Sequence, residues 1–104
     1  IEAGRKEGKL LVGGTAGPST GHYVVPTVFT DVAPTARIAQ EEIFGPVLAV
    51  IKVRDFEEGL AVANNTEYGL TGSVFTHDEA KKQRCRRVFH VGNFYINRKC
   101  TGAL

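Results

Sequence analysis

The chain has 104 residues, of which 42% are hydrophobic and 23% charged, the composition of a small globular domain with a modest core. Thirteen Lys and Arg against eleven Asp and Glu give a net charge of +2, too small to gather nucleic acid or anionic lipid by itself. No apolar run approaches the roughly 20 residues of a membrane span, so we expect neither a nucleic-acid partner nor a membrane partner.

The first half of the chain predicts short strands separated by loops. Residues 9–12 form an apolar run that ends at paired glycines, and residues 13–21 are rich in turn formers. Residues 23–29 are β-branched and aromatic, but Pro26 cannot donate to a ladder, which favours an edge strand or a bulge. Residues 31–40 are predicted to be irregular.

The second half shows a regular alternation of strands and helices. Residues 47–51 are continuously apolar, which is typical of a strand covered on both faces. Asp55 and Glu58 have the spacing of a capping box, and the helix they begin is predicted to end near Gly69. A strand at 70–76, a helix at 78–89 and a strand at 93–97 complete the order β-α-β-α-β. This order predicts the α/β class with parallel strands, preceded by short strands and loops.

Three features that could suggest a ligand have simpler interpretations. The glycines of residues 13–17 fit neither the GxGxxG pattern nor the Walker pattern of phosphate-binding loops, so a turn is favoured. The basic run at 81–87 sits toward the end of a helix that begins with acidic residues, which complements the helix dipole. The two cysteines lack the spacing of a disulfide framework or a zinc site, and neither they nor the histidines suggest a metal: Cys85, Cys100, His22, His77 and His90.

The string Glu41-Glu42-Ile43-Phe44-Gly45-Pro46, with related segments at 26–29, 63–65 and 68–71, resembles the aldehyde dehydrogenase superfamily in order and spacing. The resemblance spans nearly the whole chain and implies a part of the catalytic domain near its C-terminal end, here residues 1–104. It implies oxidation of an aldehyde to a carboxylic acid with NAD or NADP. Since the chain starts at Ile1 and contains no methionine, we expect it to be an excerpt of a longer protein.

The resemblance assigns cofactor-binding roles to two residues of the string. Glu42 would accept hydrogen bonds from the hydroxyls of the nicotinamide ribose, and Phe44 would pack against the nicotinamide. A carboxylate offers two acceptor oxygens to a cis-diol, and an aromatic face can confine a planar ring. For Glu41 a surface role is expected, because neighbouring side chains diverge; the alternative for Phe44 is a core aromatic.

No catalytic residue is expected in this chain. The family uses a cysteine nucleophile that lies upstream of the string, whereas Cys100 lies downstream of it. The general base and the nucleotide-binding half that holds most of the cofactor are likewise expected in other parts of the protein. The chain alone is therefore predicted to be inactive.

The end of the chain, residues 92–103, resembles the Δ1-pyrroline-5-carboxylate (glutamate semialdehyde) dehydrogenase branch of the family. That resemblance implies that backbone amides of Gly102 and Ala103 bind the α-carboxylate of the substrate, although a plain turn is the alternative. Another semialdehyde or aliphatic aldehyde dehydrogenase remains open, as does a non-catalytic α/β interaction module. A homo-oligomer in the cytoplasm, or in the mitochondrial matrix of a eukaryote, is expected.

Overall fold

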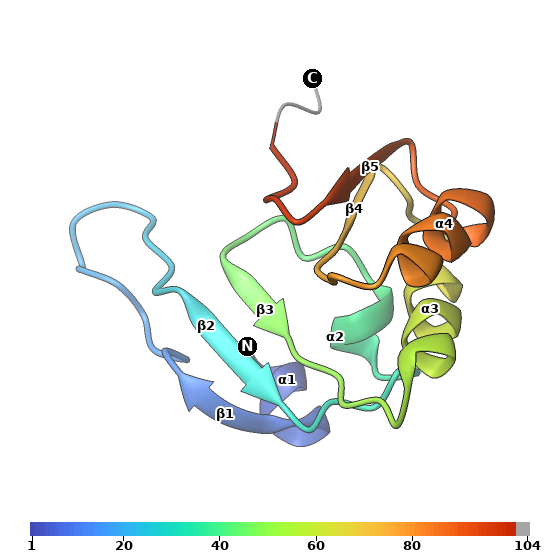
Figure 1. The fold of residues 1–104 in the computed structure, drawn as a ribbon. Helices are drawn as coiled ribbons and strands as arrows, with labels where there is room; N and C mark the ends of the chain where they lie inside the picture. Colours follow the sequence, from blue (N-terminus) through green and yellow to red (C-terminus); the bar gives the residue numbers. More distant parts are fainter. Residues whose placement is uncertain (102–104) are drawn as a thin grey trace. The chain divides into compact units, whose positions relative to one another are not determined.

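A computed structural model describes residues 1–101 of the chain, which divides into two compact units, Ile1–Lys52 and Val53–Leu104 (Figure 1). Each unit contains its own sheet and its own pair of helices. Within residues 1–101, none of the helices has the length and apolar character needed to cross a bilayer. The mixed α/β class with parallel strands, predicted from the sequence, is confirmed.

The sheet of the first unit has three strands, β1 (Lys9–Val12), β2 (Thr27–Thr30) and β3 (Val47–Ala49), in the order β1-β2-β3. β1 pairs antiparallel with β2, and β2 pairs parallel with β3. Of the two expectations for the strand around Pro26, the edge position is wrong, because β2 is the central strand; the β1–β2 ladder does contain a register shift, between Leu10 and Val12 of β1. β2 begins directly after Pro26, so the missing proline N–H falls outside the ladder and removes no hydrogen bond.

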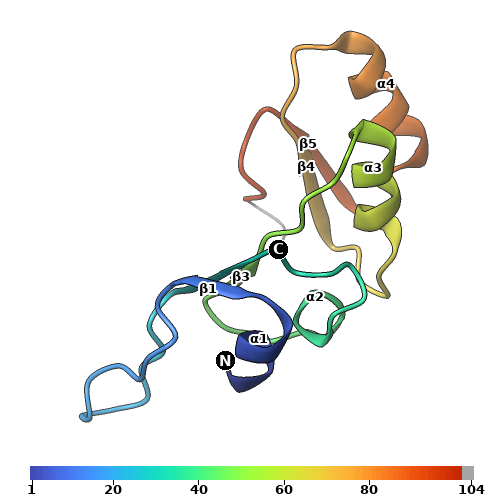
Figure 2. The same ribbon diagram turned by 90° about the horizontal axis from the view of Figure 1, so that it is seen from below.

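The glycine-rich segment that joins β1 to β2 is a loop, as predicted, and Figure 2 shows it extending away from the sheet. Gly13 and Gly14 have φ values of 77° and 79°, in the left-handed region that side chains disfavour. The Thr27 hydroxyl accepts a hydrogen bond from the Gly14 N–H at 2.9 Å and donates to the Val25 carbonyl at 2.8 Å. The loop is thus tied to the start of β2.

The first unit also contains two short helices that the sequence did not predict, α1 (Glu2–Glu7) and α2 (Arg37–Gln40). α1 packs against the sheet through Gly4, where an added Cβ would lie 2.5 Å from Cε2 of Phe29, a fully buried residue of β2. α2 lies in the segment expected to be irregular. Neither helix is long enough to show an apolar period, so only tertiary contacts reveal them.

The second unit pairs β4 (Thr71–Val74) with β5 (Asn93–Ile96) in parallel, from Thr71 opposite Asn93 to Val74 opposite Ile96. The helices α3 (Phe56–Asn64) and α4 (Glu79–Val88) lie on the same face of this pair in both views (Figures 1 and 2). The predicted order of strands and helices is confirmed. The parallel partner of β3 is β2, which precedes it in the chain, whereas β4 pairs with β5.

Both long helices begin at an aspartate cap, and the cap of α3 was predicted from the sequence. The Asp55 carboxylate accepts from the Glu58 N–H at 2.8 Å, and the Asp78 carboxylate accepts from the Ala80 N–H at 2.9 Å. The capping box at α3 is shifted by one residue, because the Glu58 carboxylate accepts from the backbone N–H of Arg54 rather than that of Asp55.

The predicted end of α3 near Gly69 is wrong, since the helix ends at Asn64. The Asn64 side chain donates to the Val88 carbonyl at 2.7 Å and accepts from the His90 N–H at 2.9 Å. These bonds tie the last residue of α3 to the end of α4. Beyond it, the Thr66 hydroxyl accepts from the Tyr68 N–H at 3.2 Å, a local turn that competes with further helix.

Candidate functional site

An exposed loop, residues 41–46, leads from α2 to β3 in the first unit. Its most unusual member is Phe44, which has φ of 54° and a side chain that is 95% exposed. A bulky residue rarely adopts this left-handed backbone, and such strain tends to collect at binding sites. Within residues 1–101 the Phe44 ring does not pack into a core, and its role in the complete protein stays a prediction.

The end of loop 41–46 is fixed to the sheet. The Val47 N–H donates to the Gly45 carbonyl at 2.8 Å, and the Thr27 N–H donates to the Pro46 carbonyl at 2.8 Å. The second bond extends the β2–β3 ladder into the loop. Gly45 and Pro46 thus form the turn into β3.

The two adjacent glutamates of the loop differ in their partners. The Glu41 carboxylate binds Arg37 of α2, with 2.6 Å between Oε2 and Nε. This hydrogen bond, together with the charge of Glu41, raises the pKa of the Arg37 guanidinium above its ordinary value. Glu42 is exposed, and within residues 1–101 its carboxylate has no hydrogen-bond or ion-pair partner. Glu41 thus serves the fold, and both carboxylate oxygens of Glu42 are unpaired within the described residues.

Glu42 borders an open hollow of about 470 Å³ on the surface of the first unit, between α1, α2 and the start of loop 41–46. Arg37, Ile38 and Ile43 contribute to the same wall. The hollow therefore combines apolar surface with charged groups, the mixture that small-molecule sites use.

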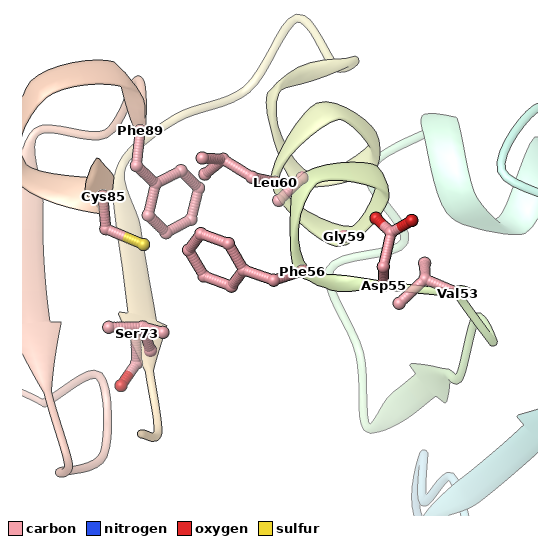
Figure 3. A pocket seen from close by; sticks show the side chains of 10 residues that line it. Val53, Asp55, Phe56, Gly59, Leu60, Ser73, Cys85 and Phe89 are labelled. Atoms are coloured by element: carbon pink, nitrogen blue, oxygen red, sulfur yellow. The ribbon is translucent and has the colours of Figure 1, made fainter. Parts of the chain in front are cut away.

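The second unit contains a more apolar hollow of about 250 Å³, between α3, α4 and β4. Figure 3 shows the rings of Phe56 and Phe89, the Leu60 side chain and the Cys85 sulfur directed into it. Its two polar side chains are engaged elsewhere: the Asp55 carboxylate caps α3, and the Ser73 hydroxyl donates to the Arg98 carbonyl at 2.7 Å. With no free polar group to orient a ligand, this hollow is part of the apolar interior of the unit.

Cys85 lacks the surroundings of an activated nucleophile. Cys85 is only 2% exposed, and its burial raises the pKa of its thiol, with a smaller contribution from the charge of Glu57. Cys100 is free and exposed, and it lies downstream of loop 41–46. Within residues 1–101 no group of three His, Cys, Asp or Glu residues could hold a metal ion.

The segment 97–101 that follows β5 is held by several hydrogen bonds. Asn97, with φ of 52°, accepts from the Thr76 N–H at 2.8 Å and donates to the Thr76 carbonyl at 3.0 Å. The Tyr95 hydroxyl donates to the Thr101 carbonyl at 2.7 Å, and the Arg98 guanidinium donates to the Thr101 hydroxyl at 3.2 Å. Gly102 and Ala103, the predicted substrate-binding residues, lie outside the described residues.

The sequence predictions did not name Glu7, Arg37 or Tyr95, although each fixes the backbone next to a predicted site. Arg37 and Glu41 have the spacing of an ion pair across one helical turn, a signal that was readable once a helix there was expected. Glu7 acts on α2 from 30 residues away, and no local pattern could reveal it.

The first unit thus combines parallel strands joined by a helix with an exposed carboxylate and an exposed aromatic ring just before β3, within an α/β fold. The comparison with known families gives the particular class. The chain belongs to the aldehyde dehydrogenase family, because the sequence model of that family matches residues 1–104.

Among curated relatives, 1-pyrroline-5-carboxylate dehydrogenase 2 of Bacillus subtilis strain 168 is 57% identical over 104 residues, covering 100% of this chain and 20% of the relative. A solved 1-pyrroline-5-carboxylate dehydrogenase from Thermus with bound NAD is 58% identical, with a TM-score of 0.95, over 99% of this chain and 20% of that one. γ-Glutamyl-γ-aminobutyraldehyde dehydrogenase from Burkholderia cenocepacia J2315 is 44% identical, with a TM-score of 0.91, over 99% and 21%. The chain thus spans about one fifth of the length of these relatives.

Proposed function

We propose that this chain supplies part of the catalytic domain of a longer NAD(P)-dependent aldehyde dehydrogenase, which oxidises an aldehyde to a carboxylic acid. The match of residues 1–104 to the family supports this proposal, as does the fivefold greater length implied by a coverage of 20% in the relatives. NAD is favoured over NADP, because the Thermus protein was solved with bound NAD. The nucleophile and the nucleotide-binding half are assigned to other parts of the longer protein.

In this proposal Glu42 and Phe44 belong to the cofactor site. The Glu42 carboxylate has two acceptor oxygens without partners in the described residues, and the two hydroxyls of a ribose can donate to such a pair of acceptors. The Phe44 ring is exposed and can lie against the nicotinamide without offering a competing polar group. When bound, NAD supplies the hydride acceptor of the reaction.

One observation carries the proposal more than any other: loop 41–46 keeps Phe44 at 95% exposure on a left-handed backbone. An exposed large aromatic ring gains no burial energy in this chain, and its backbone is strained as well. Both costs make sense when a planar ligand covers the ring in the complete protein.

As substrate we propose L-glutamate 5-semialdehyde, the open form of Δ1-pyrroline-5-carboxylate. The higher identity to 1-pyrroline-5-carboxylate dehydrogenases, 57% and 58%, than to the γ-glutamyl-γ-aminobutyraldehyde enzyme, 44%, favours this choice. Gly102 and Ala103 would bind its α-carboxylate through their amides, and the bonds from Tyr95 and Arg98 to Thr101 would set where that segment begins.

We further propose a homo-oligomer in a reducing compartment, the cytoplasm or the mitochondrial matrix. The cellular location rests on two cysteines without a disulfide pattern.

The test uses the full-length enzyme that carries this segment, with Glu42→Gln and, as a matched control on the adjacent residue, Glu41→Gln. Glu42→Gln should raise the KM for NAD or lower kcat by roughly 10- to 150-fold, because a charge-assisted pair of hydrogen bonds is weakened. Glu41→Gln should alter either constant far less, since Glu41 binds Arg37.

Each variant is assayed with glutamate 5-semialdehyde and with a small aldehyde that has no carboxylate. The proposal expects the enzyme to prefer the carboxylated aldehyde, and Glu42→Gln to affect both substrates equally. Equal kcat/KM for the two aldehydes would contradict the substrate proposal. Unchanged NAD constants in Glu42→Gln would contradict the role of Glu42.

A further inference from the structure

A carboxylate on α1 holds the start of the helix that leads into loop 41–46. Oε1 of Glu7 accepts from the Arg37 N–H at 3.1 Å, and Oε2 accepts from the Ile38 N–H at 3.0 Å. Both oxygens are thus engaged with the first two N–H groups of α2. The N-cap residue Ala36 makes no side-chain cap, so Glu7 supplies the missing acceptors from a distant part of the chain.

α2 depends on this contact more than a long helix would. It has four residues, a single turn, and so short a helix does not hold its shape in water without outside support. Arg37 is its first residue, and Arg37 in turn fixes Glu41 twice. The guanidinium binds the Glu41 carboxylate at 2.6 Å, and the Arg37 carbonyl accepts from the Glu41 N–H at 2.8 Å.

Glu7 is itself on a well-anchored element. Gly4 of α1 is buried against the ring of Phe29, which is 0% exposed in the centre of the sheet. The Gly8 N–H closes the helix on the Gly4 carbonyl at 2.9 Å. The chain of contacts therefore runs from the sheet through α1 and Glu7 to α2, and ends at the residue before Glu42.

From this geometry we infer that Glu7 is a positioning residue for cofactor binding, which acts through α2 on the direction of the Glu42 carboxylate; the inference rests on the proposed role of Glu42. A carboxylate that must meet two ribose hydroxyls together tolerates little displacement of its backbone. Glu7 does not contact the cofactor. It sets where the backbone of loop 41–46 leaves α2.

The experiment is a double-mutant cycle in the full-length enzyme, with Glu7→Ala, Glu42→Gln and the double variant. The dissociation constant of NAD is measured by titration, and the KM for the aldehyde is measured beside it. Glu7→Ala should weaken NAD binding about fivefold, the size expected for loss of a helix cap. The aldehyde KM should stay near that of the unmodified enzyme.

In the Glu42→Gln background, Glu7→Ala should add little further loss, because the group it positions is already impaired. Glu7→Gln keeps one acceptor oxygen and should fall between Glu7→Ala and the unmodified enzyme, and it carries the test if Glu7→Ala does not fold. Glu67→Ala, which removes an exposed carboxylate of the second unit, serves as the control and should leave NAD binding unchanged.

Two results would overturn the inference while leaving Glu42 in place. One is an unchanged NAD dissociation constant in Glu7→Ala alongside a weakened one in Glu42→Gln. The other is fully additive losses in the double variant, which would mean that Glu7 acts independently of Glu42. A third result, no effect of Glu42→Gln on NAD binding, would instead contradict the proposed function itself.

Discussion

Loop 41–46 of the first unit and the apolar hollow of the second unit make opposite use of their residues. The loop exposes a large aromatic ring and a glutamate without a partner in the described residues. The hollow gathers Phe56, Leu60, Cys85 and Phe89, while its polar side chains cap a helix or bind the backbone. The smaller hollow, of about 250 Å³, is lined by apolar core residues, whereas the larger one beside loop 41–46, of about 470 Å³, borders the unpaired carboxylate of Glu42.

The adjacent residues Glu41 and Glu42 also differ in whether their side chains are paired within the fold. Glu41 is neutralised by Arg37 and holds the end of α2, whereas the Glu42 carboxylate has no partner in the described residues. A side chain that is paired within the fold is no longer available to bind a ligand. Unpaired polar groups and strained exposed residues therefore distinguish the candidate site, and an apolar hollow alone does not.

The largest effect is expected for Leu60→Ala in the full-length enzyme. Leu60 is 7% exposed and lines the hollow, so its truncation should lower the free energy of unfolding by about 2–5 kcal/mol. At a temperature where the variant is folded, the dissociation constant of NAD should not change. Denaturant unfolding and NAD titration of the same sample check both statements. A weakened NAD affinity would show that the apolar hollow, like loop 41–46, contributes to cofactor binding.

Phe44→Gly should have the opposite effects, with stability retained and the use of NAD impaired. Glycine accepts the φ of 54° without a steric penalty, so the free energy of unfolding should stay the same or rise by up to about 1 kcal/mol. The loss of the ring should raise the KM for NAD or lower kcat. A thermal melt and steady-state kinetics test the two halves, and a clear fall in stability would show that the ring supports the fold.

The sequence predicted the start of α3 from the capping-box spacing of Asp55 and Glu58, and it placed α4 correctly within residues 78–89. It missed α1 and α2, which are one or two turns long and owe their shape to Phe29 and Glu7. It also placed β2 at an edge, because Pro26 was counted within the strand rather than just before it.

The residues of the candidate site were predicted from the string at 41–46, but the residues that hold the neighbouring backbone were not predicted. The resemblance pointed to Glu42 and Phe44, and the structure adds the exposure and the backbone strain that make these residues available. Glu7 and Tyr95 escaped prediction because they act on the site through the backbone of other segments. Such contacts are set by tertiary packing and leave no local pattern.

A smaller effect is expected for Tyr95→Phe, which asks whether the second unit also contributes to binding, through segment 97–101. The variant removes the hydrogen bond from the Tyr95 hydroxyl to the Thr101 carbonyl, worth about 1 kcal/mol. It should lower kcat/KM for the carboxylated aldehyde about fivefold and that for a small aldehyde less. Equal losses on the two substrates would place the hydroxyl in a purely structural role.

The smallest effect concerns pH and a carboxylate that serves the fold. The hydrogen bond from the Arg54 backbone, followed by that from the Arg54 side chain, lowers the pKa of Glu58 below its ordinary value of 4.5. These bonds therefore stabilise the fold fully above that value, and the contribution is lost as pH falls through the lowered pKa. Unfolding measured from pH 6 to pH 3 should show a shallower acid slope in Glu58→Gln, and an identical slope would contradict this assignment.

The most direct test of the central claim is a crystal structure of the full-length enzyme with bound NAD. The distances to measure run from the two carboxylate oxygens of Glu42 to the two hydroxyl oxygens of the nicotinamide ribose. Our account predicts that both lie within about 2.5–3.0 Å, with Phe44 against the nicotinamide ring. A ribose bound by Glu41 instead, or a Glu42 carboxylate that faces solvent away from the cofactor, would contradict it.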